Sequence, residues 1–406
     1  MKQTILFVDQ TSSWGGAQHV LEIVLGGLEP EFTPIVALPE DGPFSNELRH
    51  RGIETLNLPL GTYRSGRKTF ADMMTFAPRS VHCGAQLTQI IRRRNVRLVY
   101  INGPRCLPAG ILAARSTGVP SLFHVHLTMT RATEILVMRL AAPRATEIVA
   151  CCEAAAAPLL ENCPNLKSKL QVVYNPVRAL VSKTALLAQH DARAAALMNS
   201  PHPIIGLIGR ICPQKRQHIL LRAAAHLKNR GRDVQIVFLG SPRENSVEDA
   251  SYARFLKSSA HRLGLEEQIK WAGYQSDPNS YYATFDVLVI PSTGSEGLPL
   301  AVLEALQWSI PVVGSPVGGI PEIIRPGVNG FLVPPMDDEA LAESLEQILS
   351  DPGLRLRLQA GARATIDSRF SLETFTNSIR NIVSRLCESG GTVADRQQAR
   401  QLEMRV

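Results

Sequence analysis

Short apolar runs alternate with longer segments of helical periodicity along most of the chain. The runs are rich in β-branched and aliphatic residues, as strands are, and the longer segments repeat apolar residues every three to four positions, as amphipathic helices do. Several runs are apolar throughout instead of alternating, which indicates strands that are buried on both faces. The succession of strand, helix and strand therefore predicts parallel sheets with helices on both sides.

The predicted elements form two series. Strands of the first series are expected at Ile5–Val8, Pro34–Leu38, Arg97–Ile101, Ser121–Val125, Thr146–Ala150 and Leu170–Val173. Strands of the second series are expected at Ile204–Ile208, Val234–Leu239, Ile269–Ala272, Asp286–Ile290 and Pro311–Gly314. Helices are expected at Ala17–Gly27, Gln217–Asn229, Ala250–Leu263, Pro299–Gln307 and Asp338–Ser350.

A weakly patterned stretch separates the two series of strands. Its end, Asn199–Pro203, is rich in proline and small polar residues and precedes a new apolar strand, as at many domain boundaries. We therefore expect two Rossmann-like domains, over residues 1–178 and 200–365, with a linker over 179–199.

The end of the chain differs from both domains. Residues 366–387 are expected to hold an amphipathic helix whose apolar side runs from Phe370 to Leu386. The remaining residues, 388–406, are polar and predict a frayed tail.

Composition narrows the class of protein. Of 406 residues, 45% are hydrophobic and 19% are charged, which excludes a disordered or fibrous protein. Aromatic residues make up 5% and the formal net charge is +7, so we expect no nucleic-acid partner. Seven cysteines without a CxxC motif indicate neither a disulfide scaffold nor a zinc site, and favour a cytoplasmic location. No signal-peptide pattern or run of about 18 apolar residues is found, so we expect no membrane span.

Candidate chemistry lies in the loops that follow the strands, because ligands of open α/β sheets bind beyond the carboxyl ends of the strands. The segment Gly294–Leu306 follows a buried strand and opens a helix, whose free amide donors suit a diphosphate. Glu296 and Glu304 can accept paired hydrogen bonds from sugar hydroxyls. Taken singly, each is explained better as a capping carboxylate or a solvated helix residue.

Arg210 and Lys215 lie between a predicted strand and the next helix. Fixed positive charge at that position can neutralise a departing diphosphate without a metal. A pair of ordinary surface cations is the alternative explanation.

Two further loops belong to the first series. Gly15 and Gly16 allow close approach of the backbone to a ligand, but the GxGxxG fingerprint of dinucleotide sites is missing, and a tight turn is the alternative. His124 and His126 share one face of a strand without a third metal ligand, so no metal site is expected. We expect His126 to reach the ligand and His124 to be a hydrogen-bonded core histidine.

Together these segments resemble the retaining nucleotide-sugar glycosyltransferases of glycosyltransferase family 4. The resemblance is carried by Glu296 and Glu304 with seven residues between them, followed by Pro311–Glu322 and Gly327–Gly330. Gly15-Gly16, His126, Asn175-Pro176, Arg210 and Lys215 match the family in order and spacing. It implies an α/β protein of the GT-B fold, with two Rossmann-like domains whose parallel sheets face a central cleft, and a C-terminal helix that crosses back to the first domain.

The resemblance also implies roles for single residues. The catalytic set would be Glu296 facing the donor sugar, His126 reaching it from the N-terminal domain, and Arg210 and Lys215 on the diphosphate. Glu304 would hold the ribose hydroxyls. The donor site would further include Gly15, Gly16, Gly273, Tyr274, Gly297, Leu298, Pro299 and Leu300. This sequence departs from the family pattern at Gln18, Leu127, Cys152 and Pro176.

The implied reaction transfers a sugar, with retention, from a UDP- or GDP-linked donor to a glycan or lipid-linked acceptor in cell-surface polysaccharide or lipopolysaccharide synthesis. The attack would be on the same face as the leaving group, with no metal or other cofactor. A sugar-nucleotide epimerase of the same fold, an NAD-type Rossmann oxidoreductase and a non-catalytic binder are the alternatives.

Membrane contact is a separate expectation for the N-terminal domain. Cations lie there on either side of a group of apolar residues, a composition that can rest on anionic lipid at the inner face of a membrane. The residues are Arg64, Arg67, Lys68 and Arg79 with Phe70, Met73, Met74 and Phe76. A loop of mixed composition explains them equally well.

Overall fold

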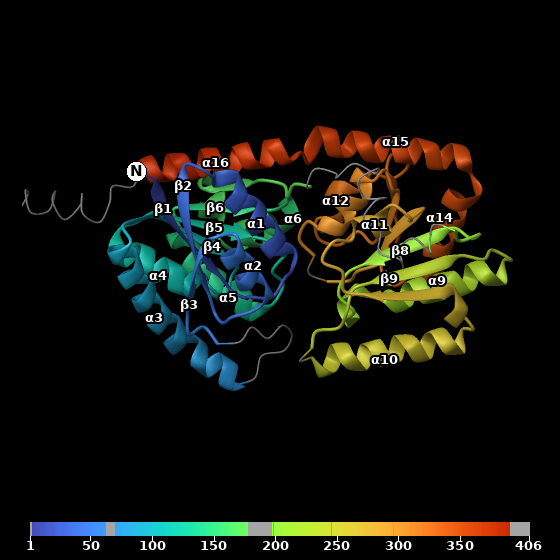
Figure 1. Cartoon of the computed structure of the whole chain (residues 1–406), viewed down its shortest axis with the longest axis horizontal. Helices are drawn as coiled ribbons and strands as arrows, with labels where there is room; N and C mark the ends of the chain where they lie inside the picture. Colours follow the sequence, from blue (N-terminus) through green and yellow to red (C-terminus); the bar gives the residue numbers. More distant parts are fainter. Residues whose placement is uncertain are drawn as a thin grey trace, which may run out of the picture. The chain divides into compact units, whose positions relative to one another are not determined.

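A computed structural model describes residues 2–61, 70–177, 197, 199–244, 246–294 and 296–389 of the chain. They divide into two compact units, which we call the first and the second unit (Figure 1). The first unit holds the residues up to Asn175 together with the segment from Glu373 onward, and the second unit runs from Pro176 to Leu372. Most of the expected linker, 179–199, lies outside the described residues.

The first unit is built on a sheet of seven parallel strands in the order β3-β2-β1-β4-β5-β6-β7. The strands are β1 (Gln3–Asp9), β2 (Phe32–Leu38), β3 (Glu54–Asn57), β4 (Val96–Asn102), β5 (Ser121–Val125), β6 (Glu147–Ala150) and β7 (Leu170–Val172). Ile5 to Val8 of β1 are completely buried, which confirms the double-sided burial predicted from their uninterrupted apolar run. The edge strand β3 was not predicted, because Glu-Thr-Leu-Asn is no apolar run.

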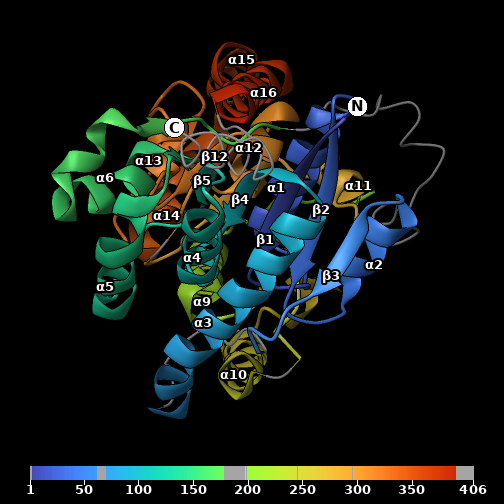
Figure 2. The same cartoon turned by 90° about the vertical axis from the view of Figure 1, so that its left-hand side faces the viewer.

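Helices cover both faces of this sheet. They are α1 (Gly16–Leu28), α2 (Pro43–His50), α3 (Phe70–Arg93), α4 (Leu107–Thr117), α5 (Ala132–Ala141) and α6 (Glu153–Asn162), with 3-10 turns η1 (Ala142–Arg144) and η2 (Pro164–Ser168). Right-handed crossovers place α1 and α2 on one face and the row from α3 to α6 on the other (Figure 2). Gly84 lets α3 approach α4 closely, because a Cβ atom there would lie 2.6 Å from the Leu112 side chain.

The last helix of the described residues, α16 (Leu372–Ser389), packs on the first unit. Its apolar side, from Phe375 to Leu386, is buried, and its Arg380 donates a hydrogen bond to the Gly27 carbonyl of α1 at 2.6 Å. The predicted amphipathic helix is therefore present, but Phe370 is not part of it. Phe370 instead ends the preceding helix, where it is buried.

The second unit is built on six parallel strands in the order β10-β9-β8-β11-β12-β13. They are β8 (Ile204–Ile208), β9 (Gln235–Leu239), β10 (Ile269–Gly273), β11 (Val287–Ile290), β12 (Val312–Gly314) and β13 (Gly330–Leu332). The three-residue edge strand β13 was not predicted, because it is too short to form a recognisable apolar run. The other strands of both series were predicted close to their observed bounds.

The helices of the second unit include two that match the expected bounds, α9 (Gln217–Asn229) and α14 (Asp338–Ser350). The others are α10 (Val247–Arg262), α11 (Asn279–Tyr282), α12 (Leu300–Gln307), α13 (Ile320–Ile323) and α15 (Pro352–Arg369), with 3-10 turns η3 (Pro213–Lys215) and η4 (Glu266–Gln268). Helices α9 and α14 pack together over the core of the sheet. Helix α15 was not predicted; it packs on α12, so the second unit extends past residue 365 to Leu372.

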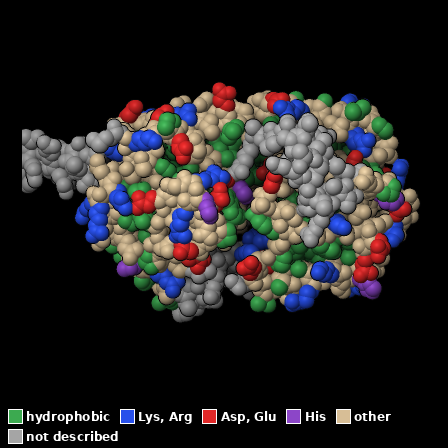
Figure 3. Space-filling model, viewed as in Figure 1, with side chains coloured by type: hydrophobic (Ala, Val, Ile, Leu, Met, Phe, Trp, Pro, Cys, Tyr) green, Lys and Arg blue, Asp and Glu red, His purple; other side chains and the backbone are tan. Residues whose placement is uncertain are grey.

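The expected membrane-contact residues are only partly described. Arg64, Arg67 and Lys68 lie outside the described residues, whereas Arg79 belongs to α3 and not to a loop. On the face shown in Figure 3, Lys and Arg side chains lie among Asp and Glu instead of gathering in one patch. Within the described ranges, every helix is too short or too polar to cross a bilayer.

Candidate functional site

In the second unit, the loops that follow β8 and β11 are joined at the carboxyl edge of the sheet. The amide of Thr293 donates to the Gln214 carbonyl at 2.9 Å, and Arg216 Nε donates to Thr293 Oγ1 at 2.7 Å. These contacts bring together two predicted site residues, because Lys215 Nζ lies 2.7 Å from Glu296 Oε1. The Lys215 and Glu296 side chains are 20% and 9% exposed, so this ion pair is largely withdrawn from water.

A glycine after β12 holds the loop that carries Glu296. Gly318 has a φ of +55°, and a Cβ atom there would lie only 2.0 Å from the Glu296 carbonyl oxygen. The next residue, Gly319, donates its amide to the Gly297 carbonyl at 2.9 Å. Within the Gly-Gly pair that contributes to the family resemblance, Gly318 is therefore the residue that close backbone contact with the Glu296 loop requires.

Arg210 directly follows β8 and Gly209 at the same edge. Its carbonyl accepts a hydrogen bond from Gln217 Nε2 at 2.9 Å, and its Nε is buried without a hydrogen-bond partner among the residues that the structure describes. Burial alone would raise the pKa of Asp249, but hydrogen bonds and charge from Arg243, with a contribution from Arg210, hold it below its usual range. The edge therefore carries positive charge from both Arg210 and Lys215.

Glu304, on α12, is held by a tyrosine that the sequence did not single out. The fully buried Tyr282 hydroxyl of α11 donates to Glu304 Oε2 at 2.8 Å. Burial raises the pKa of Tyr282 and the Glu304 charge raises it further, so the hydroxyl keeps its proton. Tyr282 thus fixes the carboxylate that the resemblance assigns to ribose.

The other predicted donor-site residues of the second unit lie at the same edge or next to it. Gly273 ends β10 with a φ of +72°, and the Tyr274 amide donates to Ser241 Oγ at 3.0 Å while its side chain is exposed. Leu298 is buried, and Pro299 caps the N-terminus of α12, which begins at Leu300.

In the first unit, buried polar residues meet at the carboxyl edge of the sheet. Asp9 of β1 pairs in register with Asn102 of β4, and Asn102 pairs with His124 of β5. Asn102 Nδ2 donates to Asp9 Oδ2 at 2.5 Å, and Gln18 Nε2 donates to both Asp9 oxygens at 3.0 and 3.1 Å. His126 Nε2 lies 2.6 Å from Asn102 Oδ1.

The two histidines have different surroundings. His124 Nδ1 shares a hydrogen bond with the buried Tyr100 hydroxyl at 2.6 Å, which is the core position expected for it. The rings of His124 and His126 lie 3.9 Å apart. Burial lowers the pKa of His126 to about 3 and that of His124 well below its usual value, so both rings are neutral at physiological pH.

Sequence reasoning missed Asp9 and Asn102. Asp9 accepts hydrogen bonds from Gln18 and Asn102, and Asn102 contacts His126. Each ends an apolar strand, and this position at neighbouring parallel strands is the signal that could have identified them. The structure also explains why glutamine stands at position 18, where the family often has glutamate. An amide can donate to the Asp9 carboxylate, whereas a second carboxylate would repel it.

The Gly15-Gly16 loop is supported from α2. Gly15 caps α1, and the neighbouring Trp14 ring contacts Phe44 at 4.9 Å. Phe44 donates its amide to the Ser12 carbonyl at 2.8 Å, and a Cβ at Gly42 would lie 2.8 Å from the same oxygen.

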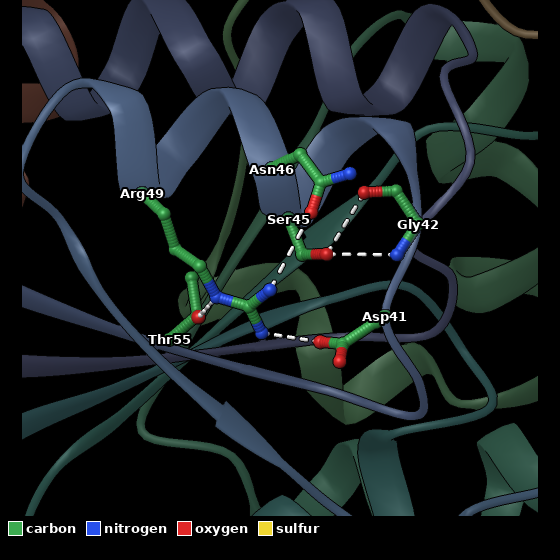
Figure 4. A network of polar contacts seen from close by, with 6 residues as sticks. All are labelled: Asp41, Gly42, Ser45, Asn46, Arg49 and Thr55. Atoms are coloured by element: carbon green, nitrogen blue, oxygen red, sulfur yellow. Dashed lines mark hydrogen bonds and ion pairs between the residues drawn. The ribbon is translucent and has the colours of Figure 1, made fainter.

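A polar network keeps the start of α2 in place (Figure 4). Ser45 Oγ accepts from the Gly42 amide at 2.8 Å, and Arg49 pairs with Asp41 and donates to Thr55 Oγ1 at 2.7 Å. This network fixes the α2 backbone against which the Gly15-Gly16 loop rests.

No group of three or more His, Cys, Asp or Glu residues is arranged to hold a metal ion within the described ranges.

Two family profiles match the chain. The family described as "Glycosyl transferase 4-like domain" matches residues 15–176, and the family described as "Glycosyl transferases group 1" matches residues 189–365. The matches fall on the first and the second unit, respectively, and together take in most of the chain.

The chain is also similar to individual curated proteins. It is 30% identical over 202 residues to the alpha-D-kanosaminyltransferase of Streptomyces kanamyceticus, which covers 48% of this chain and 50% of that protein. It is 30% identical over 182 residues to the lipopolysaccharide core biosynthesis glycosyltransferase LpsE of Rhizobium meliloti, covering 45% of this chain and 50% of that protein. The chain thus spans about half the length of the curated relatives it matches.

Among solved structures, the chain is similar to Alr3699/HepE of Anabaena in complex with UDP. The TM-score is 0.78 and the sequence identity is 25%, over 95% of this chain and 100% of that one. This likeness extends over both units.

Proposed function

Because the chain belongs to the family 4-type glycosyltransferases of the GT-B fold, we propose that it transfers a sugar from a nucleoside diphosphate to an acceptor hydroxyl. The observation that carries the proposal is the Lys215–Glu296 pair at 2.7 Å, whose lysine lies in a loop that also carries Arg210 after β8 at the carboxyl edge of the second sheet. A fixed cation and a carboxylate side by side suit a ligand that has a diphosphate next to sugar hydroxyls.

The ion pair suggests how donor binding begins. Without ligand, the Glu296 carboxylate balances the charge of Lys215. A donor diphosphate would take over Lys215 and Arg210, and Glu296 would then accept hydrogen bonds from hydroxyls of the sugar. After the exchange, the negative charge of the diphosphate balances the positive charge of Lys215, which Glu296 balanced before. This matters because an unpaired charge is costly in a poorly hydrated site.

Catalysis in this proposal rests on charge at the leaving group. As the bond between C1 of the sugar and the phosphate oxygen breaks, negative charge grows on the diphosphate next to Arg210 and Lys215. Cations already in place stabilise this charge more in the transition state than in the ground state. The acceptor oxygen forms the new bond to C1 on the same face, its proton passes to a phosphate oxygen of the donor, and the configuration is retained without a metal.

For the donor we propose a UDP-linked hexose, with GDP as the alternative base. Glu304, fixed by Tyr282, would bind the ribose hydroxyls. The similar protein from Anabaena was solved with UDP and with UDP-glucose, which favours uridine.

For the acceptor we propose a glycan or lipid-linked glycan of the cell surface. This class agrees with the name of the Rhizobium meliloti relative, a lipopolysaccharide core glycosyltransferase. Such an acceptor would be met at the inner face of a membrane, where Arg79 and the 62% exposed Met74 of α3 could contact lipid. Sedimentation with anionic and neutral vesicles tests this contact, and equal sedimentation with both would count against it.

The donor site is tested by replacing Lys215 with alanine. Loss of one charge-assisted contact of about 1.5–3 kcal/mol should weaken UDP binding roughly 10- to 100-fold. Binding is measured from the rise in melting temperature with UDP, GDP and NAD. Arg230→Ala is the matched control, because Arg230 forms a 2.8 Å ion pair with Glu346 elsewhere in the second unit.

We expect a uridine or guanosine diphosphate to stabilise the wild-type protein and Arg230→Ala equally, and Lys215→Ala only at roughly 10- to 100-fold higher nucleotide concentration. Stabilisation by NAD alone would favour the oxidoreductase, and equal behaviour of the two variants would reject the assigned site. An epimerase would consume the donor without any acceptor, so donor turnover with and without lipid-linked acceptors separates it from a transferase.

A further inference from the structure

Three side chains at the carboxyl edge of the first sheet are joined in series. Asn102 Nδ2 is 2.5 Å from Asp9 Oδ2, and Asn102 Oδ1 is 2.6 Å from His126 Nε2. We call these residues the Asp9–Asn102–His126 network. Asp9 and Asn102 are almost completely buried, and strand register places them opposite each other on β1 and β4.

The network has a direction. An ionised carboxylate can only accept hydrogen bonds, so Asn102 presents its NH2 group to Asp9 and its oxygen to His126. The Asn102 oxygen can only accept, so His126 Nε2 carries the proton. In a neutral imidazole the other nitrogen, Nδ1, is then an acceptor. Gln18 donates to both Asp9 oxygens and supports this arrangement from α1.

The acceptor left by this series has no donor among the residues that the structure describes. His126 Nδ1 is buried and lacks a hydrogen-bond partner among the described residues. A buried polar atom without a partner costs free energy, so such an atom indicates a ligand or water that satisfies it. A hydroxyl group is the simplest donor that fits a neutral imidazole nitrogen.

We propose that Asp9 and Asn102 are positioning residues that hold His126 as its neutral Nε2–H tautomer, so that Nδ1 accepts a hydrogen bond from a hydroxyl of the bound sugar. This inference rests on the proposed function for the identity of the ligand. The tautomer itself is a property of the first unit alone and can be measured without any substrate.

The substitution Asp9→Asn tests the direction of the network. An amide at position 9 can donate as well as accept, so the Asn102 amide is free to turn and present its NH2 group to His126. His126 would then carry its proton on Nδ1. The control is Tyr100→Phe, which removes the hydrogen bond to the neighbouring His124 but leaves the Asp9–Asn102–His126 network intact.

The tautomer is read by long-range proton–nitrogen NMR of the full-length protein labelled with 15N-histidine. The His126 signals are assigned by their absence in His126→Gln. We expect the Nε2–H form in the wild-type protein and Tyr100→Phe, and the Nδ1–H form or a mixture in Asp9→Asn. An Nδ1–H tautomer in the wild-type protein, or no change in Asp9→Asn, overturns the inference.

Ligand contact is read in the same spectra. A UDP-linked hexose should shift the Nδ1 signal of His126, whereas UDP alone should not. The value of kcat/KM should fall about tenfold in Asp9→Asn, as expected for one lost hydrogen bond to the sugar, with unchanged stabilisation by UDP. If no nucleotide sugar binds, the proposed function has failed, while the tautomer result still stands. If UDP-hexose binds without shifting the Nδ1 signal of His126, the contact between His126 and the sugar is rejected.

Discussion

Individual side chains at the two strand edges differ in how their charge is balanced. The Lys215 ammonium lies 2.7 Å from the Glu296 carboxylate. Asp9, by contrast, accepts hydrogen bonds from the neutral amides of Asn102 and Gln18. Burial raises the pKa of Asp9 to about 6, and these hydrogen bonds offset only part of that effect. Burying the ionised Asp9 carboxylate therefore lowers the stability of the folded protein, while the carboxylate holds the Asn102 and Gln18 side chains in position.

The raised pKa of Asp9 predicts that stability falls as the pH rises. The folded protein keeps the Asp9 proton up to about pH 6, whereas the unfolded chain releases it near 3.8. The stabilising contribution is complete below about pH 4 and is lost as the pH passes 6, a change of up to about 3 kcal/mol in the free energy of unfolding. Urea unfolding of the wild-type protein and Asp9→Asn between about pH 4 and pH 7 measures it.

Over that interval the wild-type protein should lose stability relative to Asp9→Asn. Besides burial, four groups that donate hydrogen bonds to Asp9 affect its pKa: the Asn102 side chain from β4, the amide of Thr11, the Gln18 side chain from α1 and the amide of Gln10. A stability difference that is the same at both ends of the pH range would contradict the raised pKa.

Tyr282 gives a second prediction at the residue scale. In Tyr282→Phe, Glu304 loses the 2.8 Å hydrogen bond that fixes its carboxylate. We expect the Kd of UDP to rise about fivefold, which corresponds to about 1 kcal/mol. Titration calorimetry measures it, with Tyr252→Phe as the control, since that hydroxyl contacts His218 instead. A Kd that rises equally in both variants would show a general packing effect.

Among the elements, the long central strands could be predicted and the short edge strands could not. Uninterrupted apolar runs such as Ile5–Val8 carry their own signal because both faces are buried. Edge strands β3 and β13 form because a neighbouring strand, β2 or β12, offers free backbone hydrogen-bonding groups. The local sequence pattern of β3 or β13 does not indicate this pairing. Helix α3 begins next to residues of mixed composition, and its packing on α4 is a long-range effect of the same kind.

The loop after β12 gives a prediction at the element scale. In Gly318→Ala the new Cβ would lie 2.0 Å from the Glu296 carbonyl, at a φ of +55°. The Glu296 loop has to move, so we expect loss of most donor binding as well as stability. Gly327→Ala is the control, because its φ of +76° is equally strained but no atom lies within 4 Å of the new Cβ.

Gly327→Ala should lose only about 1 kcal/mol of stability and keep its affinity for UDP. Thermal unfolding with and without UDP compares the two variants. Equal UDP binding in both would show that the close approach of Gly318 does not hold the Glu296 loop.

For the molecule as a whole, the two-domain α/β fold follows from the order of its elements, and the family resemblance pointed to the Lys215–Glu296 pair. The resemblance could not reveal Asp9, Asn102 or Tyr282. Their roles depend on which strand ends lie side by side and on which atoms face each other, and both are set by tertiary structure. The expected roles of Arg210 and Glu304 stay predictions until a donor is bound.

The first unit takes its core from both ends of the sequence. Helix α16, which begins at Leu372, buries its apolar side there, and its Arg380 and Arg385 contact Gly27 and Glu147. During synthesis, the ribosome releases the complete second unit before it releases α16. The surface of the first unit that α16 covers therefore stays exposed until α16 has been synthesised. A premature stop codon after the second unit would leave this apolar surface exposed to chaperones and proteases.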